Sequence, residues 1–153
     1  MKMTMKLDGL RDLDAALGQF TKATAKGVLR RVGLKALEPM ADTARDLAPD
    51  DPETPDPDLQ STIGVGTKLN KRQAALARKD EGKAFVTVYM GTNDPAGVQQ
   101  EFGNENHGPQ PFIRPAFDQH KQGTIKLVAD GLGAEIDKTA KRVAARAAKK
   151  AAQ

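Results

Sequence analysis

The sequence has no cysteine and no tryptophan, and only one tyrosine, five phenylalanines and two histidines among its 153 residues. The absence of cysteine excludes disulfide frameworks and thiol catalysis, and it removes most structural zinc sites. No apolar run approaches the roughly 20 residues that cross a bilayer, and residues 1–10 turn polar too early to form a signal-peptide core. We therefore expect no membrane span and no standard export signal, which is consistent with a cytosolic setting.

Residues suited to catalysis or metal binding are also scarce and isolated. His107 and His120 have no cysteine and no second histidine at ligand spacing, so a metal site is not expected. Ser61 is the only serine, and the chain has no GxSxG motif, which argues against a serine hydrolase. Gly64 and Gly66 do not belong to a GxGxxG motif, so a dinucleotide site is not expected either.

Carboxylates are the remaining candidates for chemistry. Glu101 and Glu105 could form a hydrolytic pair, but Glu101 ends a predicted helix and Glu105 lies in a polar loop, which favours structural and solvated roles. The acidic loop 49–58, PDDPETPDPD, lacks the central glycine and terminal glutamate of a calcium-binding EF-hand loop. It is predicted to be solvated or to face a partner. We expect no enzymatic activity, no cofactor and no small-molecule substrate.

The size and composition predict one folded domain over residues 1–153, with a modest core and long solvated helices, because 39% of the residues are hydrophobic and 29% charged. Charge is unevenly distributed within a net total of +4. Residues 46–58 contain six acidic residues and no basic one, residues 68–83 six basic and two acidic, and residues 121–153 eight basic and three acidic. Such segregation favours head-to-tail association of copies, and the basic side alone is compatible with nucleic-acid binding.

Hydrophobic periodicity predicts the N-terminal elements. Alternation predicts a short strand at residues 3–7, and spacings of three and four predict helices at 10–18 and 21–47. Pro39 lies inside the longer helix and predicts a kink or a break at residues 35–38. The apolar face of that helix is predicted to comprise Leu29, Val32, Ala36, Met40, Ala44 and Leu47.

The middle of the chain is predicted to supply the sheet. Residues 59–69 are predicted to be extended, and residues 83–91 form the strongest strand pattern in the sequence. Residues 68–83 form a basic hairpin or arm between them. Residues 73–78 also have helical propensity, and the sequence leaves the two alternatives open.

A short helix is predicted at residues 95–102, because Asp94 can cap it and proline suits its first position. Gly103 should end this helix. A polar loop at 104–110 and an extended segment at 111–115 should follow, since proline disfavours helix in the residue before it.

The last helix is predicted to run from Pro115 to about Lys150. Gly131 and Gly133 lower its helical propensity, so it is expected to bend or fray there. Together these elements predict an α+β fold, in which a small antiparallel sheet packs against a long N-terminal helix pair and a long C-terminal helix. The apolar face of the last helix is predicted to comprise Ile125, Val128, Leu132, Ile136, Thr139 and Val143.

The stretch from Val98 to Phe117 concentrates three phenylalanines and three prolines in a chain that is otherwise poor in aromatic residues. Proline and phenylalanine fix geometry at low conformational cost. We interpret this stretch as a shaped contact surface. Arg114 within it could bind phosphate, but its surroundings favour a structural or intersubunit ion pair.

Several motifs occur in a fixed order: Leu-Ala-Pro at 47–49, a valine-rich segment at 86–91, Glu-Phe-Gly at 101–103 and QPFIRPAF at 110–117. In this order they resemble the family of small head-to-tail joining proteins of tailed phages. Its members are described as neck, tail-completion or putative tail component proteins, and they also occur in prophages and gene transfer agents. The resemblance covers about residues 7–117.

The resemblance implies a homo-oligomeric ring, expected to be a hexamer, between the portal assembly of the capsid and the tail tube. Its other partners would be adjacent connector or stopper proteins and tail-tube proteins, in a virion assembled in the bacterial host cytoplasm. Neck, tail terminator and tail completion are not distinguished. We hypothesise that the ring contact involves Glu101, Phe102, Gly103, Pro111, Phe112, Arg114 and Pro115.

Two alternatives stay open at this point. Phe112 and Phe117 could instead be core residues that anchor the last helix, in which case replacing Phe112 by Ala would unfold the protein rather than abolish a ring. The basic end of the last helix, residues 138–153, could contact DNA without sequence specificity or face a partner. The basic residues concerned are Lys138, Lys141, Arg142, Arg146, Lys149 and Lys150.

Overall fold

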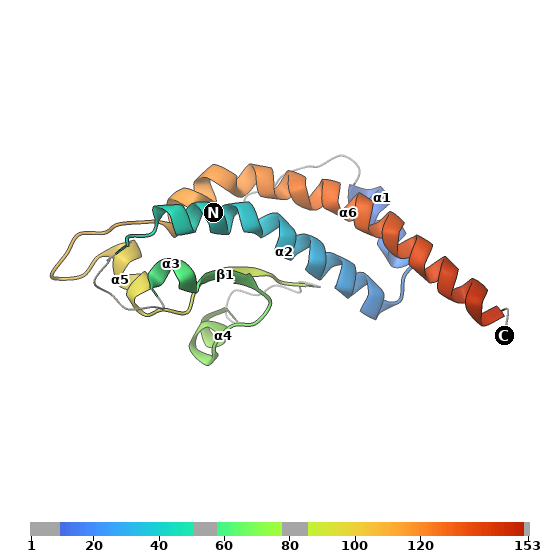
Figure 1. The fold of residues 1–153 in the computed structure, drawn as a ribbon, viewed down its shortest axis with the longest axis horizontal. Coiled ribbons are helices and arrows are strands. Elements are labelled where there is room, and N and C mark those ends of the chain that lie inside the picture. The colour runs from blue at the N-terminus through green and yellow to red at the C-terminus, as the bar shows by residue number, and fades with distance from the viewer. Residues whose placement is uncertain (1–9, 51–57, 78–85, 152–153) are drawn as a thin grey trace.

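The computed structural model describes residues 10–50, 58–77 and 86–151, which form an α+β fold (Figure 1). The predicted fold class is confirmed, because helices from both ends of the chain accompany a small antiparallel sheet. The elements in chain order are α1 (Leu10–Gly18), α2 (Lys22–Leu47), α3 (Leu59–Thr62), β1 (Ile63–Gly66), α4 (Lys71–Ala77), β2 (Tyr89–Thr92), α5 (Ala96–Phe102) and α6 (Ile113–Ala151).

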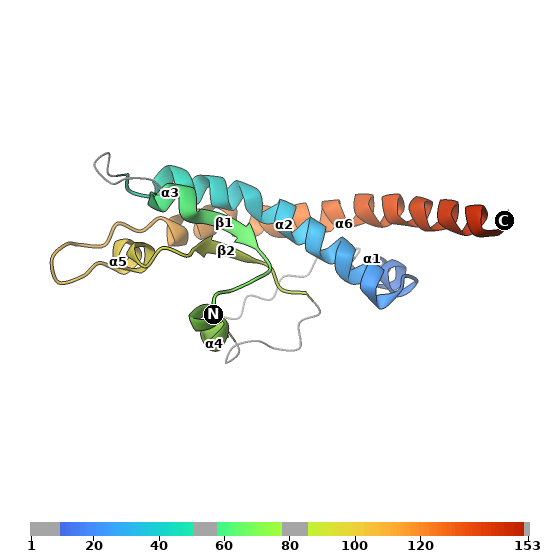
Figure 2. The ribbon, with the colours of Figure 1, turned by 60° about the horizontal axis from the view of Figure 1, so that its bottom comes forward.

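The two longest helices, α2 and α6, lie side by side and run in opposite directions (Figure 1). Figure 2 shows β1 and β2 on one side of this helix pair, with α3 and α5 near one end of the sheet. Helix α4 lies on the side of the sheet away from the helix pair (Figure 2). At the other end of the molecule, away from α3 and α5, helix α1 packs against α6. The fold is therefore elongated, and its two ends are built from different elements.

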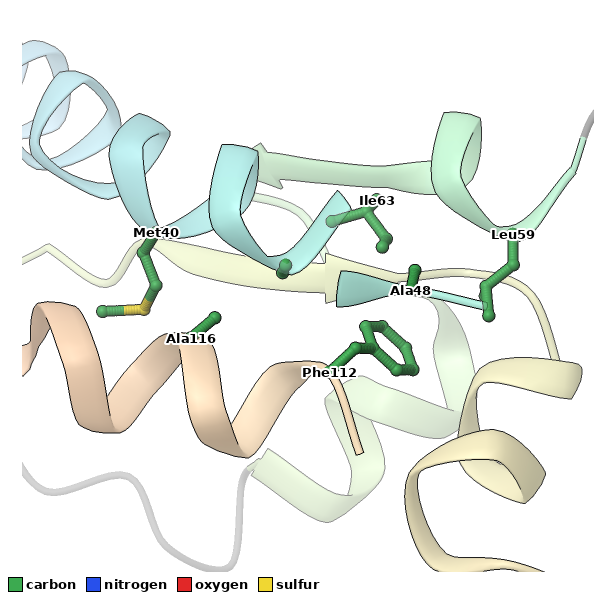
Figure 3. Close-up of a cluster of buried hydrophobic side chains, with 7 residues drawn as sticks. Met40, Ala48, Leu59, Ile63, Phe112 and Ala116 are labelled. Carbon is green, nitrogen blue, oxygen red and sulfur yellow. The ribbon is translucent and has the colours of Figure 1, made fainter. Parts of the chain in front are cut away.

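Two clusters of buried apolar side chains hold these layers together. The first centres on the fully buried Phe112 and joins α2, α3, β1 and the first turns of α6 (Figure 3). The second joins α2 and α6 further along, and α1 packs against it. The predicted apolar faces are confirmed except at Leu47 and Val143, which are 45% and 47% exposed. The two clusters consist of Met40, Ala44, Ala48, Leu59, Ile63, Phe112 and Ala116, and of Val28, Val32, Leu132 and Ile136.

The N-terminal helices have the predicted bounds to within one residue. Helix α2 begins at Lys22, because the hydroxyl oxygen of Thr21 accepts the N–H of Thr24 (3.3 Å) and so caps the helix. Of the predicted kink or break at residues 35–38, the break is wrong, since α2 continues through Pro39, and the kink stays a prediction. The carbonyl that loses its hydrogen bond belongs to Lys35, an exposed residue where water can replace the missing donor.

Helix α6 is likewise continuous through Gly131 and Gly133, so the predicted fraying there is wrong, and the alternative of a bend stays a prediction. At Gly131 the two long helices approach closely. A Cβ atom at this position would lie 3.1 Å from Cγ1 of Val32, whereas one at Gly133 would meet nothing within 4 Å. Packing against α2 explains why the first of these glycines does not interrupt the helix.

The sheet pairs β1 with β2 in antiparallel register, from Ile63 opposite Thr92 to Gly66 opposite Tyr89. The predicted strand at 83–91 is therefore too long: residues 86–88 lie outside β2, because β1 offers only four partners. Val88 instead packs against α2 at Gly33.

The predicted extended segment at 59–69 is correct only for β1. Residues 59–62 form α3, because the carboxylate of Asp58 accepts the N–H of Ser61 (2.8 Å) and nucleates a helical turn. Residues 71–77 form α4, so the helical alternative holds for this part of the basic segment.

Helix α4 begins with a reciprocal cap, in which the backbone N–H groups of Asn70 and Gln73 each donate to the other residue's side chain (3.1 and 2.8 Å). The predicted strand at 3–7, most of the acidic loop 49–58 and residues 78–85 lie outside the described residues. In the part of the chain that is described, no helix is long and apolar enough to cross a membrane.

Candidate subunit interface at the start of the last helix

Helix α6 begins at Ile113, two residues earlier than predicted, so the expected extended segment at 111–115 is wrong over its second half. The first backbone N–H groups of a helix have no partner within it. Here the carboxylate of Glu101 supplies the partners. Its Oε2 accepts the N–H groups of Phe112 and Ile113 (2.8 and 2.9 Å), and its Oε1 accepts that of Arg114 (3.1 Å).

Pro115 completes this arrangement, because it has no N–H to satisfy, and the next residue makes the first bond within the helix. The N–H of Ala116 donates to the carbonyl oxygen of Phe112 (3.4 Å). A carboxylate at this position also faces the positive end of the helix dipole. Glu101 therefore offsets the preference of Arg114, as the residue before proline, for extended backbone.

Glu101 is only 4% exposed. Burial by itself raises the pKa of its carboxyl, but the hydrogen bond from the Arg114 side chain and those from three backbone N–H groups together hold this pKa below its ordinary value. The Nε atom of Arg114 lies 2.7 Å from Oε1 of Glu101. The residue is therefore an ionised carboxylate at neutral pH, fixed by four donors.

Arg114 also connects this buried carboxylate to the surface. Its Nη2 donates to the backbone carbonyl oxygen of Glu101 (2.6 Å), and its guanidinium group lies over the ring of Phe102, 4.9 Å from the centroid. The Phe102 side chain is still 65% exposed. One face of the Phe102 ring therefore packs against the guanidinium group of Arg114, which Glu101 holds in place.

Helix α5 has its apolar and polar sides reversed relative to a normal surface helix. Its buried residues are Gly97 and Glu101, whereas Val98 and Phe102 are 64% and 65% exposed. Gly97 has no room for a side chain, because an added Cβ would collide with the side chain of Thr92. Val98 and Phe102, four residues apart, therefore form an apolar patch on the outward face of α5.

The same surface continues onto α6. Phe117 is 50% exposed, with the ammonium group of Lys121 6.0 Å from its ring centroid, and Lys121 is held by Asp118 (2.7 Å). Arg114 and Phe117 line a largely apolar groove of about 560 Å³ between α2 and α6. We refer to Val98, Phe102, Arg114 and Phe117 as the α5–α6 surface.

The polar loop 104–110 projects at this end of the molecule (Figure 1) and is held by its own hydrogen bonds. Gly103 ends α5 with φ of 77°, and a Cβ there would lie 2.9 Å from the nitrogen of Pro109. Asn104 Oδ1 accepts the N–H groups of Asn106 and His107 (2.8 and 3.0 Å). The loop is therefore shaped before any partner arrives.

The structure brings the hypothesised contact residues together at one end of the molecule, but not all of them reach the surface. Glu101 and Phe112 are buried, and the full burial of Phe112 agrees with the core alternative. The core alternative is wrong for Phe117, which is half exposed. Val98 begins the stretch interpreted as a contact surface but was not among the hypothesised contact residues, although its spacing of four residues from Phe102 was a usable signal.

The basic residues at the end of α6 lie far from the α5–α6 surface, at the opposite end of the helix (Figure 1). Those whose side chains are described are all exposed: Lys138, Lys141, Arg142, Arg146 and Lys149. The two candidate sets predicted from the sequence therefore form two separate surfaces.

The described residues contain no group of three or more His, Cys, Asp or Glu side chains that could hold a metal ion. Comparison with protein-family models, curated proteins and solved structures gave no match to this chain.

Proposed function

We propose that this protein is a structural virion protein that forms a ring at the head–tail junction of a tailed phage, prophage or gene transfer agent. It acts as a neck, tail-terminator or tail-completion protein and joins the DNA-filled capsid to the tail. Its partners are other copies of itself, as a hexamer, and the adjacent connector, stopper and tail-tube proteins. It has no catalytic role.

The observation that carries this proposal is the reversed polarity of α5. A monomer would leave Val98, Phe102 and Phe117 in water, although Arg114, held by the buried carboxylate of Glu101, already fixes the ring of Phe102. Aromatic residues and arginine are enriched in the centres of protein interfaces. The motif order from Leu-Ala-Pro to QPFIRPAF supplies the phage context of the proposal.

The experiment is to measure assembly by gel filtration with light scattering and by negative-stain imaging. The wild type should form rings, and the double variant Val98→Ser/Phe102→Ser should lose them while remaining folded by circular dichroism. Leu127→Ser is the matched control, because Leu127 is 46% exposed but lies away from the α5–α6 surface. A double variant that assembles like the wild type would contradict the proposal.

A second candidate function is DNA binding without sequence specificity, which the exposed basic residues at the end of α6 favour. Its affinity would fall steeply with salt as phosphate contacts release counterions. A protein that stays monomeric and binds duplex DNA tightly at physiological salt would support this alternative over the ring.

A further inference from the structure

The last turns of α6 stand apart from the rest of the fold. We call residues 140–151 the α6 extension. Figures 1 and 2 both show it projecting past the ends of α2 and α1. Its described side chains are exposed on every side, including Val143, the one large apolar residue among them. No packing within the described part of the chain explains why this helix extends so far.

A free helix of this length gains little stability in water, since most helical stability in proteins comes from packing. The alanine content favours helix, but it offers little apolar surface to bury. A partner of the extension would therefore recognise charge more than shape.

The charge is arranged on one side. Lys138, Lys141, Arg142, Arg146 and Lys149 recur at spacings that keep them on one face of a helix. No acidic residue follows Asp137. Lys138 is 3.8 Å from Glu135, whereas Lys141, Arg146 and Lys149 make no ion pair with any described residue.

The helix dipole accounts for only part of this pattern. Cations near the C-terminus of a helix are favourable, but the effect falls off within the last turn. That explains Lys149, but not Lys141 or Arg142, which lie two or more turns before the end of α6.

The opposite end of the molecule has the opposite charge. Asp46 in the last turn of α2 and Asp50 just beyond it are exposed, and neither forms an ion pair with a described residue. Negative charge is unfavourable at a helix C-terminus. Local helix electrostatics therefore does not explain these carboxylates, whereas a cationic partner would.

We propose that the α6 extension of one copy docks against the acidic end of the next copy, at Asp46 and Asp50. Both halves of this contact belong to the same chain and lie at opposite ends of its long axis (Figure 1). A second copy is therefore favoured over DNA, which would match the basic half alone. Such unlike surfaces make a head-to-tail contact that closes into a ring or grows as a filament.

This inference rests on the proposed function for the ring but uses a different surface from the α5–α6 surface. The test is a charge exchange measured by sedimentation velocity. Arg142→Glu/Arg146→Glu and Asp46→Lys/Asp50→Lys should each weaken self-association about tenfold at low salt. Mixing the two variants, or combining all four substitutions, should restore it. Lys68→Glu/Lys71→Glu is the control for an equal change in net charge on exposed residues.

The outcomes separate the two proposals. Restoration by the exchanged charges supports head-to-tail docking. Assembly that is unchanged in both charge variants but lost in Val98→Ser/Phe102→Ser overturns the docking and leaves the proposed function standing. Loss of duplex DNA binding in Arg142→Glu/Arg146→Glu, with no restoration of assembly by exchange, overturns it in favour of a nucleic-acid contact.

Discussion

The first residues of α6 are anchored by a buried carboxylate and a fully buried phenylalanine, whereas the last residues of the same helix are exposed on every side. At the first end, Glu101 satisfies every backbone donor that the helix leaves free. At the last end, basic side chains line one face of the helix, whose full length is about 58 Å at 1.5 Å per residue. One helix thus serves as a structural anchor at one end and as an unpartnered arm at the other.

The difference concerns where the stability of the fold resides. Backbone hydrogen bonds, a buried carboxylate and apolar packing coincide around Phe112, so a change there affects the whole domain. The α6 extension contributes surface but little packing. Substitutions at the two ends should therefore differ in kind: the first should alter folding and the second should alter association.

The largest effect is expected for Phe112→Ala, which removes a side chain with no exposed surface. The free energy of unfolding should fall by about 4 kcal/mol, measured by urea denaturation. Phe117→Ala is the control for the same chemical change on a half-exposed ring, and it should cost less than about 1 kcal/mol. An equal fall in the free energy of unfolding in the two variants would contradict the conclusion that Phe112 anchors the first end of α6 in the core.

An intermediate effect is expected for Glu101→Gln, which keeps the shape of the side chain but removes its charge. The free energy of unfolding should fall by about 2 kcal/mol, because three backbone donors and an arginine lose a charged acceptor. Glu105→Gln in the exposed loop is the matched control and should change stability by less than about 0.5 kcal/mol.

The stability difference between wild type and Glu101→Gln should also depend on pH. Folding lowers the pKa of Glu101, so its stabilising contribution is complete above the unfolded value of about 4.3 and is lost as the pH falls through the folded pKa. Denaturation curves of the two proteins should therefore converge in acid. A difference that stays constant down to strongly acidic pH would show that the charge is not what stabilises α6.

The smallest effect is expected in the middle of α6, where the packed half meets the exposed half. Gly133→Ala should raise the free energy of unfolding by up to about 1 kcal/mol, since alanine favours helix and its Cβ meets nothing. Gly131→Ala should gain less or lose stability, because its Cβ would press on Val32 (3.1 Å). Thermal unfolding of both variants checks this order, and a Gly131→Ala variant that is more stable than Gly133→Ala would contradict the close approach of α2 and α6.

Much of the helical architecture was predictable because its signals are local. The apolar spacing of α1 and α2 and the end of α5 at Gly103 depend on residues within one or two turns of one another. The strand at 83–91 was predicted too long, because the length of a strand depends on its partner. The start of α6 was placed too late, because its cap comes from Glu101, more than ten residues earlier.

The candidate surface was only partly predictable. The sequence indicated that Phe102 and Arg114 belong to a contact region, and it placed basic residues at the end of the last helix. It did not reveal that α5 turns Gly97 and Glu101 inward, since an isolated helix with Val98 and Phe102 on one side is expected to bury that side. Phe112 and Phe117, both phenylalanines of one motif, have opposite environments that only their neighbours decide.

The sequence by itself determined α1, α2, α5, most of α6, the fold class and the separation of acidic from basic segments, because periodicity and charge are properties of neighbouring residues. The tertiary structure alone decided that a glutamate from one helix caps another, which side of α5 faces outward, and that the acidic end of α2 lies at the other end of the molecule from the α6 extension. These features depend on contacts between residues far apart in the chain, and such contacts form only when α2, α6 and the sheet pack together.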